Sequence, residues 1–105
     1  MKISYAITVC NEHKELRTLL DFLFKHKRKE DEVVVQKDNG NATEEVWDVC
    51  ERFESEQAAE YKHISHALNK NFAQYKNNLN RNCSGDWIFQ IDADEIPNEY
   101  LIQAL

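Results

Sequence analysis

One stretch near the end of the sequence, residues 85–97, most constrains the fold. It begins with Gly85, runs through bulky strand-forming residues and ends in three carboxylates before Pro97. A mostly apolar run between turn signals predicts a buried strand in a sheet that is covered on both faces. Because proline cannot donate to a strand ladder and suits the first turn of a helix, we expect the strand to end, and a helix to begin, around Pro97.

The three carboxylates lie at the carboxyl end of this strand, the edge at which open α/β sheets bind ligands. They are Asp92, Asp94 and Glu95. Hard carboxylate oxygens suit Mg²⁺ or Mn²⁺, with water and a phosphate-bearing substrate completing the coordination, so this position favours a metal site. The alternative is a solvated loop in an acidic protein. An EF-hand is excluded, because Ile96 and Pro97 occupy positions where that loop needs a ligand and a glycine.

The rest of the chain alternates between strand and helix patterns. Strands are predicted over residues 3–10, 32–37 and 61–65. The intervening helices are predicted from apolar stripes, which comprise Leu16, Leu19, Leu20, Leu23 and Phe24, then Val46, Val49, Cys50 and Phe53, then Phe72, Tyr75, Leu79 and Cys83. The third helix is expected from Asn69, with Gly85 closing it. The order β-α-β-α-β-α-β indicates a Rossmann-like α/β domain, a mostly parallel sheet between two helical layers.

One interpretation of the polar residues at the strand ends is that their roles are structural. We expect Asn11 to cap the first helix and Thr43 or Asn41 to cap the second. Asp38 begins an Asp-Asn-Gly sequence, which is typical of a turn. The basic cluster at residues 26–31 is explained more simply by the dipole at a helix carboxyl end than by an anionic partner.

Composition excludes several classes of protein. The 105 residues suffice for one domain, and a net charge of −6 argues against nucleic-acid binding. Gly40 and Gly85 are the only glycines, so neither G-x-G-x-x-G nor a P-loop is present. No apolar run reaches membrane-spanning length. Three cysteines without a C-x-x-C pair (Cys10, Cys50 and Cys83) predict buried, reduced thiols in a cytoplasmic protein.

Polar side chains follow three of the predicted strands at one edge of the sheet. They are Thr8, Asn11 and Glu12 from the first strand, Asp38 from the second, and Asp92 and Asp94 from the last. Because the strands are expected to be parallel, these side chains outline a crevice rich in hydrogen-bond acceptors and carboxylates. In an acidic crevice, a diphosphate ligand would need a cation to bring it in.

In this order and spacing, the motifs resemble the nucleotide-binding half of family 2 glycosyltransferases, which have the GT-A fold. The resemblance covers essentially the whole chain. It is carried by Ile7–Glu12, Val33–Gly40, Lys76-Asn77 and Gly85–Glu95, the last being similar to the family's "G-D-(W/Y)-I-…-D-A-D" segment. Each motif is loose alone, but their order and spacing together are specific.

The resemblance implies a role for each site residue. Thr8 and its neighbours Asn11 and Glu12 would line the base pocket, and Asp38 would accept a hydrogen bond from the base. Asp92 would lie near the ribose or the metal, and Asp94 would be the principal metal ligand. Lys76 stands where the family usually has arginine, toward the diphosphate. Lysine keeps the charge at this position but lacks the planar fork that contacts phosphate through two hydrogen bonds.

The function implied is transfer of a sugar from a nucleotide-diphosphate sugar, with a UDP-sugar as the leading candidate, to a carbohydrate or glycan acceptor. The cofactor implied is Mn²⁺ or Mg²⁺. In the family the acceptor-binding half and the catalytic base come later in the chain, so we expect residues 1–105 to lack both. The alternatives are a non-catalytic nucleotide-binding module acting through a partner chain, and a structural α/β domain without a ligand. A homo-oligomer could cover exposed apolar surface.

Overall fold

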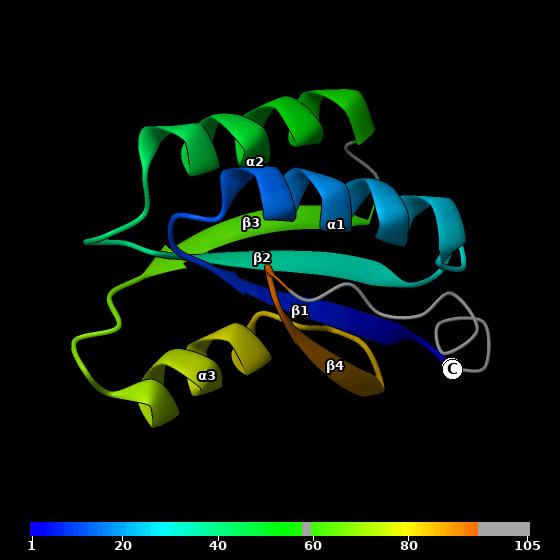
Figure 1. Cartoon of the computed structure of the whole chain (residues 1–105). Coiled ribbons are helices and arrows are strands. Elements are labelled where there is room, and N and C mark those ends of the chain that lie inside the picture. Colours follow the sequence, from blue (N-terminus) through cyan, green and yellow to red (C-terminus); the bar gives the residue numbers. More distant parts are fainter. Residues whose placement is uncertain (58–59, 95–105) are drawn as a thin grey trace.

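The computed structural model describes residues 1–57 and 60–94, which form a four-stranded sheet with helices on both faces (Figure 1). The elements are β1 (Ile3–Val9), α1 (His13–His26), β2 (Glu32–Asp38), α2 (Glu44–Gln57), β3 (Tyr61–His66), α3 (Phe72–Arg81) and β4 (Trp87–Asp92). Helices α1 and α2 lie over one face, and α3 lies over the other. The predicted Rossmann-like α/β fold is therefore confirmed. The helix expected at Pro97, together with Glu95, lies outside the described residues.

All the strand pairs are parallel, and the strand order is β3-β2-β1-β4. In this register Thr8 lies opposite Gln36 on β2 and Asp92 on β4. Asp38, the last residue of β2, lies opposite His66 at the end of β3. The carboxyl ends of the four strands consequently meet at one edge of the sheet.

The main core lies between the sheet and the α1–α2 layer. The predicted stripe residues Leu16, Leu19, Leu20 and Leu23 are fully buried there against β-branched and aromatic strand residues. Three rings at the end of this layer pack together, because the Phe53 ring lies 4.9 Å from Phe24 and 5.2 Å from Tyr61 between centroids. The apolar periodicity of both helices therefore predicted the correct inward face.

Only one of the two expected helix caps is present. Thr43 caps α2, because its side-chain oxygen accepts from the backbone N–H of Val46 at 3.4 Å. The prediction for Asn11 is wrong: Glu12 occupies the N-cap position of α1 and makes no side-chain capping bond. Asn11 instead lies exposed in the turn between β1 and α1.

The same core face also contains a buried lysine that the sequence did not reveal. Lys37 on β2 is 1% exposed, and its Nζ donates to His63 Nδ1 at 2.6 Å and lies 4.2 Å from the ring centroid of Trp47. Burial lowers the pKa of Lys37. Burial, and then the charge of Lys37, lower the pKa of His63 as well. This group joins α2 to β2 and β3.

The α3 side of the sheet has a much smaller core. Its buried residues are Ala6, Val34 and Leu79, with Ile64 and Cys83 packed against them. The third helix begins at Phe72 rather than at Asn69, because Asn69 and Lys70 adopt positive φ angles of 47° and 59° that end regular structure before it. The predicted inward position of Phe72 is wrong, because this side chain is 67% exposed.

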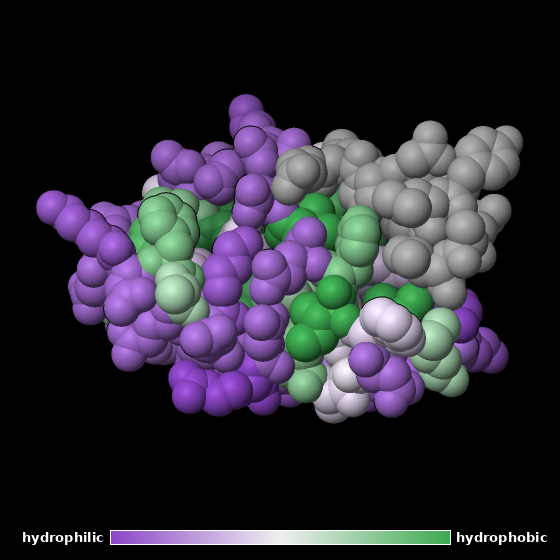
Figure 2. Space-filling view, turned by 90° about the horizontal axis from the view of Figure 1, so that it is seen from below, coloured by the Kyte–Doolittle hydropathy of each residue, from purple (hydrophilic) through white to green (hydrophobic). Residues whose placement is uncertain are grey.

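The last strand, β4, is only partly buried, which corrects the prediction of a strand covered on both faces. It lies at an edge of the described sheet, where Trp87 is 65% and Ile88 40% exposed. Phe89 and Ile91 pack toward the α1 side, with the Phe89 ring 6.0 Å from that of Tyr5. Seen from the α3 side, a mostly hydrophilic surface is interrupted by hydrophobic patches (Figure 2).

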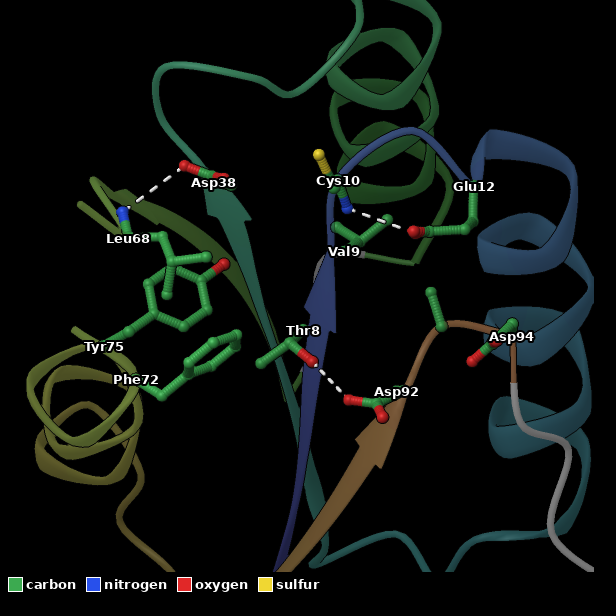
Figure 3. Close-up of a pocket in the computed structure, with 11 residues that line it drawn as sticks. Thr8, Val9, Cys10, Glu12, Asp38, Leu68, Phe72, Tyr75, Asp92 and Asp94 are labelled. Carbon is green, nitrogen blue, oxygen red and sulfur yellow. Dashed lines mark hydrogen bonds between the residues drawn. The ribbon is translucent and has the colours of Figure 1, made fainter. Parts of the chain in front are cut away.

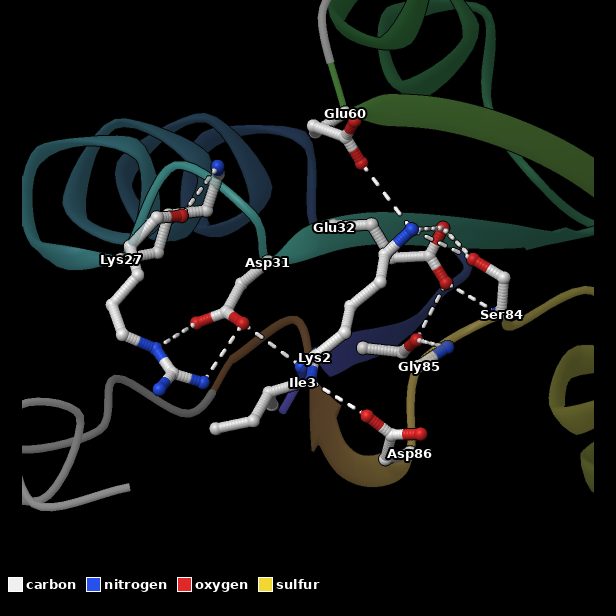
Figure 4. Close-up of polar contacts among 11 residues, drawn as sticks. Lys2, Ile3, Lys27, Asp31, Glu32, Glu60, Ser84, Gly85 and Asp86 are labelled. Atoms are coloured by element: carbon white, nitrogen blue, oxygen red, sulfur yellow. Dashed lines mark hydrogen bonds and ion pairs between the residues drawn. The ribbon is translucent and has the colours of Figure 1, made fainter.

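At the amino edge of the sheet, a polar network joins β2 to the segment that enters β4 (Figure 4). Glu32 accepts hydrogen bonds from Ser4 Oγ at 2.5 Å and from the backbone N–H and side chain of Ser84 at 2.5 and 3.0 Å. Asp31 accepts from the backbone N–H of Ile3 at 2.8 Å and from the Arg28 guanidinium. Both carboxylates are buried.

A close steric contact in this network explains the glycine at position 85. The prediction that Gly85 closes α3 is wrong. Its φ is not positive, and α3 is closed at Asn82. A Cβ at position 85 would lie 2.6 Å from Ser4 Oγ and 2.8 Å from Ser4 N. The β4 entry therefore approaches β1 so closely that only glycine fits.

Two further predictions concern the cysteines and the membrane. All three cysteines are free thiols, with Cys50 buried and Cys10 and Cys83 half-buried. Within residues 1–57 and 60–94, none of the helices has the length and apolar character needed to cross a bilayer.

Candidate functional site

A pocket of about 270 Å³ opens at the carboxyl edge of the sheet (Figure 3). Residues from β1, β2, α3, β4 and the loops that follow the strands line it. They are Thr8, Val9, Cys10, Glu12, Asp38, Leu68, Phe72, Tyr75, Asp92, Ala93 and Asp94. The pocket thus forms where the parallel strands end, as the order of the elements predicts.

The pocket floor is formed where β1 pairs with β4. Thr8 Oγ1 donates to Asp92 Oδ1 at 2.8 Å, and the backbone N–H of Ala93 donates to Thr8 O at 3.0 Å. These bonds fix the turn after β4, in which Ala93 is buried while Asp92 and Asp94 on either side of it are exposed. Both carboxylates are therefore accessible to a ligand at the pocket.

Asp38 forms part of the opposite side of the pocket, at the end of β2. Its carboxylate accepts from Asn41 Nδ2 at 3.0 Å and from the backbone N–H of Leu68 at 3.4 Å, and its carbonyl accepts from the N–H groups of Asn41 and Ala42. Asp38 therefore has the turn role that its Asp-Asn-Gly context indicates. The same bonds hold its carboxylate at the pocket wall, and a carboxylate has about four lone-pair sites, so acceptor capacity remains.

An apolar wall, defined as Leu68, Phe72 and Tyr75, stands beside Asp38. Tyr75 is 5% exposed, and its hydroxyl donates to the carbonyl of Gln36 at 3.2 Å. Burial, and then the nearby charge of Asp38, raise the pKa of Tyr75, so this ring stays neutral and fixed. Sequence reasoning assigned no site role to this wall. Its signal was Leu68 and Phe72 on either side of a polar Asn-Lys-Asn turn.

The turn between β1 and α1 forms the remaining wall. Glu12 Oε2 accepts from the backbone N–H of Cys10 at 3.3 Å, which folds the glutamate back over the turn. Burial, and then the charges of Asp38 and Glu12, raise the pKa of the Cys10 thiol. The thiol is consequently neutral, and the negative charge of this wall comes from Glu12.

The structure gathers most of the predicted site residues and leaves two outside the pocket lining. Thr8, Glu12, Asp38, Asp92 and Asp94 all line it. Asn11 is exposed in the neighbouring turn, and Lys76 is half-buried on α3, one residue beyond Tyr75. The carboxyl ends of β1, β2 and β4 therefore account for every predicted residue that reaches the pocket.

The electrostatic character of the pocket is strongly negative. Four of its lining residues are carboxylates, namely Glu12, Asp38, Asp92 and Asp94, and among the described residues no lysine or arginine lines it. A phosphate would be repelled by this arrangement unless a cation came with it.

The described residues fit a metal site shared with a ligand and do not fit a self-contained one. Over residues 1–57 and 60–94, no group of three or more histidine, cysteine or acidic side chains is arranged to hold a metal ion. Mg²⁺, however, is commonly held by one or two carboxylates plus substrate phosphates and water. The exposed pair Asp92 and Asp94 offers the hard oxygen ligands that such a site needs.

A parallel α/β sheet with a pocket outside the carboxyl ends of its strands has the arrangement in which open α/β domains bind ligands. Comparison with known proteins narrows the class of protein. A family model described as glycosyl transferase family 2 matches residues 4–105. The chain belongs to this family, as its motifs predicted.

A comparison with the curated proteins found no match. Among solved structures, the crystal structure of S. aureus TarS 1-349 is similar, with a TM-score of 0.78 and 21% sequence identity. The match covers 99% of this chain and 31% of the TarS chain. The chain therefore spans about a third of that structure, and the likeness at this identity supports the fold.

Proposed function

We propose that the described residues form the donor-binding part of a glycosyltransferase, which holds a nucleotide-diphosphate sugar with Mn²⁺ or Mg²⁺ for transfer to a carbohydrate acceptor. One observation carries this proposal: in a chain of family 2, the carboxylates at the carboxyl ends of β2 and β4 meet at one pocket with Thr8. The family supports glycosyl transfer in general. The nucleotide, the metal and the acceptor are the proposed parts.

The negative pocket supports a metal-dependent mode of binding. A diphosphate and the four lining carboxylates repel one another, and a divalent cation between them turns that repulsion into attraction. We assign Asp94 as the principal metal ligand and Asp92 as the second. Asp92 is oriented by Thr8 through the 2.8 Å hydrogen bond, which suits a residue that positions the ribose or the metal.

The remaining residues divide between the base and the phosphates. Asp38 is fixed at the pocket wall by its bonds to Asn41 and Leu68, and we assign it as the acceptor for an N–H of the base. Thr8 and Glu12 line the nucleotide pocket, with Asn11 in the adjoining turn.

We assign Lys76 to the diphosphate from the family resemblance alone, because its side chain is not among the lining residues. Sugar transfer leaves negative charge on the departing diphosphate. When bound, a divalent metal acts there as a Lewis acid. Lys76, on the helix that supplies the Phe72 and Tyr75 rings, would add fixed positive charge to the same group.

Calorimetric titration of UDP tests the proposal, first with Mn²⁺ and then with a chelator. We expect binding that requires the metal and that falls at least about tenfold in Asp94→Asn, which keeps the shape of the side chain and removes its charge. Asp48→Asn is the matched control, because Asp48 is an exposed aspartate on α2 whose carboxylate pairs with Arg52.

The result that would overturn the proposal is an absence of binding by wild type to UDP, GDP and dTDP in the presence of Mn²⁺. Equal binding with and without metal would overturn the metal assignment and leave the nucleotide assignment standing. For Lys76, Lys76→Ala should weaken UDP binding, while Lys76→Arg should retain or strengthen it, because arginine restores the planar fork. Equal affinity in all three proteins would remove Lys76 from the site.

A further inference from the structure

Phe72 is a large apolar side chain left in water at the mouth of the pocket. It is 67% exposed and lines the pocket, although the helical stripe of α3 predicted it to be inward. Local sequence patterns most often fail at functional positions, where binding requires what folding alone would not select. At the mouth of a pocket, an exposed aromatic ring offers a large apolar face to a ligand that enters it.

The backbone before Phe72 is held in an unfavourable conformation that positions it. Asn69 and Lys70 both have left-handed φ angles, although each has a Cβ that disfavours them. The loop is fastened on both sides, because Leu68 N donates to Asp38 Oδ1 at 3.4 Å and Asn71 N donates to Leu68 O at 2.8 Å. Strain of this kind persists only where the surroundings enforce it, and it gathers at ligand sites.

The start of α3 is fixed as well. Asn71 Oδ1 accepts from the backbone N–H of Gln74 at 3.1 Å, which caps the helix. Phe72 is the first residue of this helix, and it directly follows the capping residue and the strained loop. The ring is therefore presented to the pocket by a defined backbone rather than by a free loop end.

The pocket has an aromatic half and an acidic half (Figure 3). Phe72 and Tyr75 lie on the side of Asp38, and Asp94 lies on the far side of Asp92. Tyr75 is 5% exposed with its hydroxyl bound to Gln36 O, so Phe72 offers the larger accessible ring surface. A flat π surface next to a fixed carboxylate matches a planar heterocycle that carries an N–H donor on its edge.

We propose that Phe72 is the stacking surface for the base of the bound nucleoside diphosphate, with Asp38 accepting from the edge of the same base. This inference rests on the proposed function, since it assigns the aromatic half of the pocket to the base and the acidic half to the metal and diphosphate. Phe72 is then a specificity residue that distinguishes a nucleoside diphosphate from diphosphate alone. Asp38 then discriminates among bases, because it accepts a hydrogen bond only from a base that has a donor at the matching position on its edge.

The test compares a probe that has a base with one that lacks it. UDP and inorganic pyrophosphate are each titrated, in the presence of Mn²⁺, into wild type and three variants, namely Phe72→Ala, Phe72→Leu and Phe72→Tyr. If wild type binds GDP or dTDP more tightly than UDP, that nucleotide is used in place of UDP. We expect Phe72→Ala to weaken nucleotide binding about tenfold, because stacking of a base on an aromatic ring has that order of effect. Phe72→Leu keeps an apolar side chain without a π surface and should lose part of the affinity. Phe72→Tyr should bind as wild type does, and pyrophosphate should bind all four proteins equally.

A matched control is Trp87→Ala, which removes another exposed aromatic side chain, 65% exposed, at the start of β4 far from the pocket lining. It should leave both affinities unchanged. Thermal melting of Phe72→Ala should resemble that of wild type, because the deleted ring is mostly in solvent. Unchanged melting excludes misfolding as the cause of weaker binding.

The outcomes separate this inference from the proposed function. Equal nucleotide affinity in wild type and Phe72→Ala overturns the stacking role while the nucleotide site stands. An equal loss for UDP and pyrophosphate also overturns it, because the effect would then come from the loop and not from the base. If wild type binds pyrophosphate but none of the nucleotides, or binds neither, the proposed function fails and this inference fails with it.

Discussion

Carboxylates lie both at the amino edge and at the carboxyl edge of the sheet, where the strands begin and end, but their surroundings differ. At the amino edge, Asp31 and Glu32 are 1% and 6% exposed, and their oxygens accept hydrogen bonds from backbone and side-chain donors (Figure 4). At the carboxyl edge, Asp92 and Asp94 are exposed and line the pocket (Figure 3). The contrast distinguishes carboxylates that are buried within the fold from the exposed carboxylates that we propose as ligands.

The charge state of the amino-edge pair follows from these donors. Burial acts to raise the pKa of Glu32, but hydrogen bonds from Ser4 and Ser84 and the charge of Lys2 outweigh it, so the pKa is lowered. The pKa of Asp31 is lowered in the same way, against burial, by Arg28 and by the N–H of Ile3. These carboxylates are therefore ionised and satisfied within the fold, and they hold β1, β2 and the entry of β4 together.

The largest effect is expected from Glu32→Ala. This change leaves the buried hydroxyl of Ser4 and the part-buried N–H of Ser84 without their acceptor, and we expect a loss of about 3 kcal/mol in the free energy of unfolding. Urea denaturation measures it. Glu30→Ala is the control, because Glu30 is an exposed neighbour whose ion pair with Arg28 is also exposed. A loss below about 1 kcal/mol would mean that the amino-edge network is not structural.

A smaller loss is expected from Gly85→Ala. The added Cβ would meet Ser4 Oγ at 2.6 Å, Ser4 N at 2.8 Å and Lys2 O at 2.9 Å, and two of these three atoms belong to the backbone and cannot move alone. We expect about 2 kcal/mol of destabilisation from the overpacking. The matched change Gly40→Ala should have little effect, because nothing lies within 4 Å of a Cβ there. Equal melting temperatures for the two variants would contradict the close approach of β4 to β1.

The pH dependence of stability tests the same network with a smaller effect. Because the folded-state pKa of Glu32 is depressed, its contribution is fully present above the unfolded value of about 4.3 and is lost as pH falls through the lower folded value. We expect the free energy of unfolding of wild type to fall on acidification below about pH 4.3. In Glu32→Gln this fall should be shallower, since position 32 no longer titrates. Parallel curves for the two proteins would show that Glu32 does not contribute.

Much of this architecture could be predicted from the sequence because it depends on local periodicity. Alternating strand and helix patterns predicted the element order, and parallel pairing then brought Thr8, Asp38, Asp92 and Asp94 to one edge. The exposure of β4 could not be predicted in this way. Trp87 and Ile88 have the apolar character of a strand buried on both faces, whereas strand order and helix placement decide what covers them.

The missed features depend either on contacts between distant parts of the chain or on a local backbone conformation that apolar periodicity does not reveal. In the sequence Asp31 ends a charged cluster and Glu32 begins a predicted strand. Among their donors are Ile3, which lies 28 positions from Asp31, and Ser84, which lies 52 positions from Glu32. Phe72 fits the helical stripe of α3, and only the left-handed backbone at Asn69 and Lys70 explains why that helix begins with an exposed ring. The apolar periodicity of a sequence indicates which face of an element is apolar. It does not indicate where the element starts relative to its neighbours.

The smallest effect on stability should come from Asp94→Asn, and it sharpens the contrast between the edges most directly. Asp94 is exposed among three other pocket carboxylates, so removing its charge relieves repulsion and should change the free energy of unfolding by less than about 0.5 kcal/mol, in either direction. We expect UDP and Mn²⁺ to raise the melting temperature of wild type and not that of this variant, because a ligand stabilises only the folded state that binds it. Glu32→Gln should behave in the opposite way, with lower stability and a retained ligand-induced shift. If Asp94→Asn destabilises the protein as much as Glu32→Gln does, the carboxyl-edge carboxylates are structural too, and the division between the two edges does not hold.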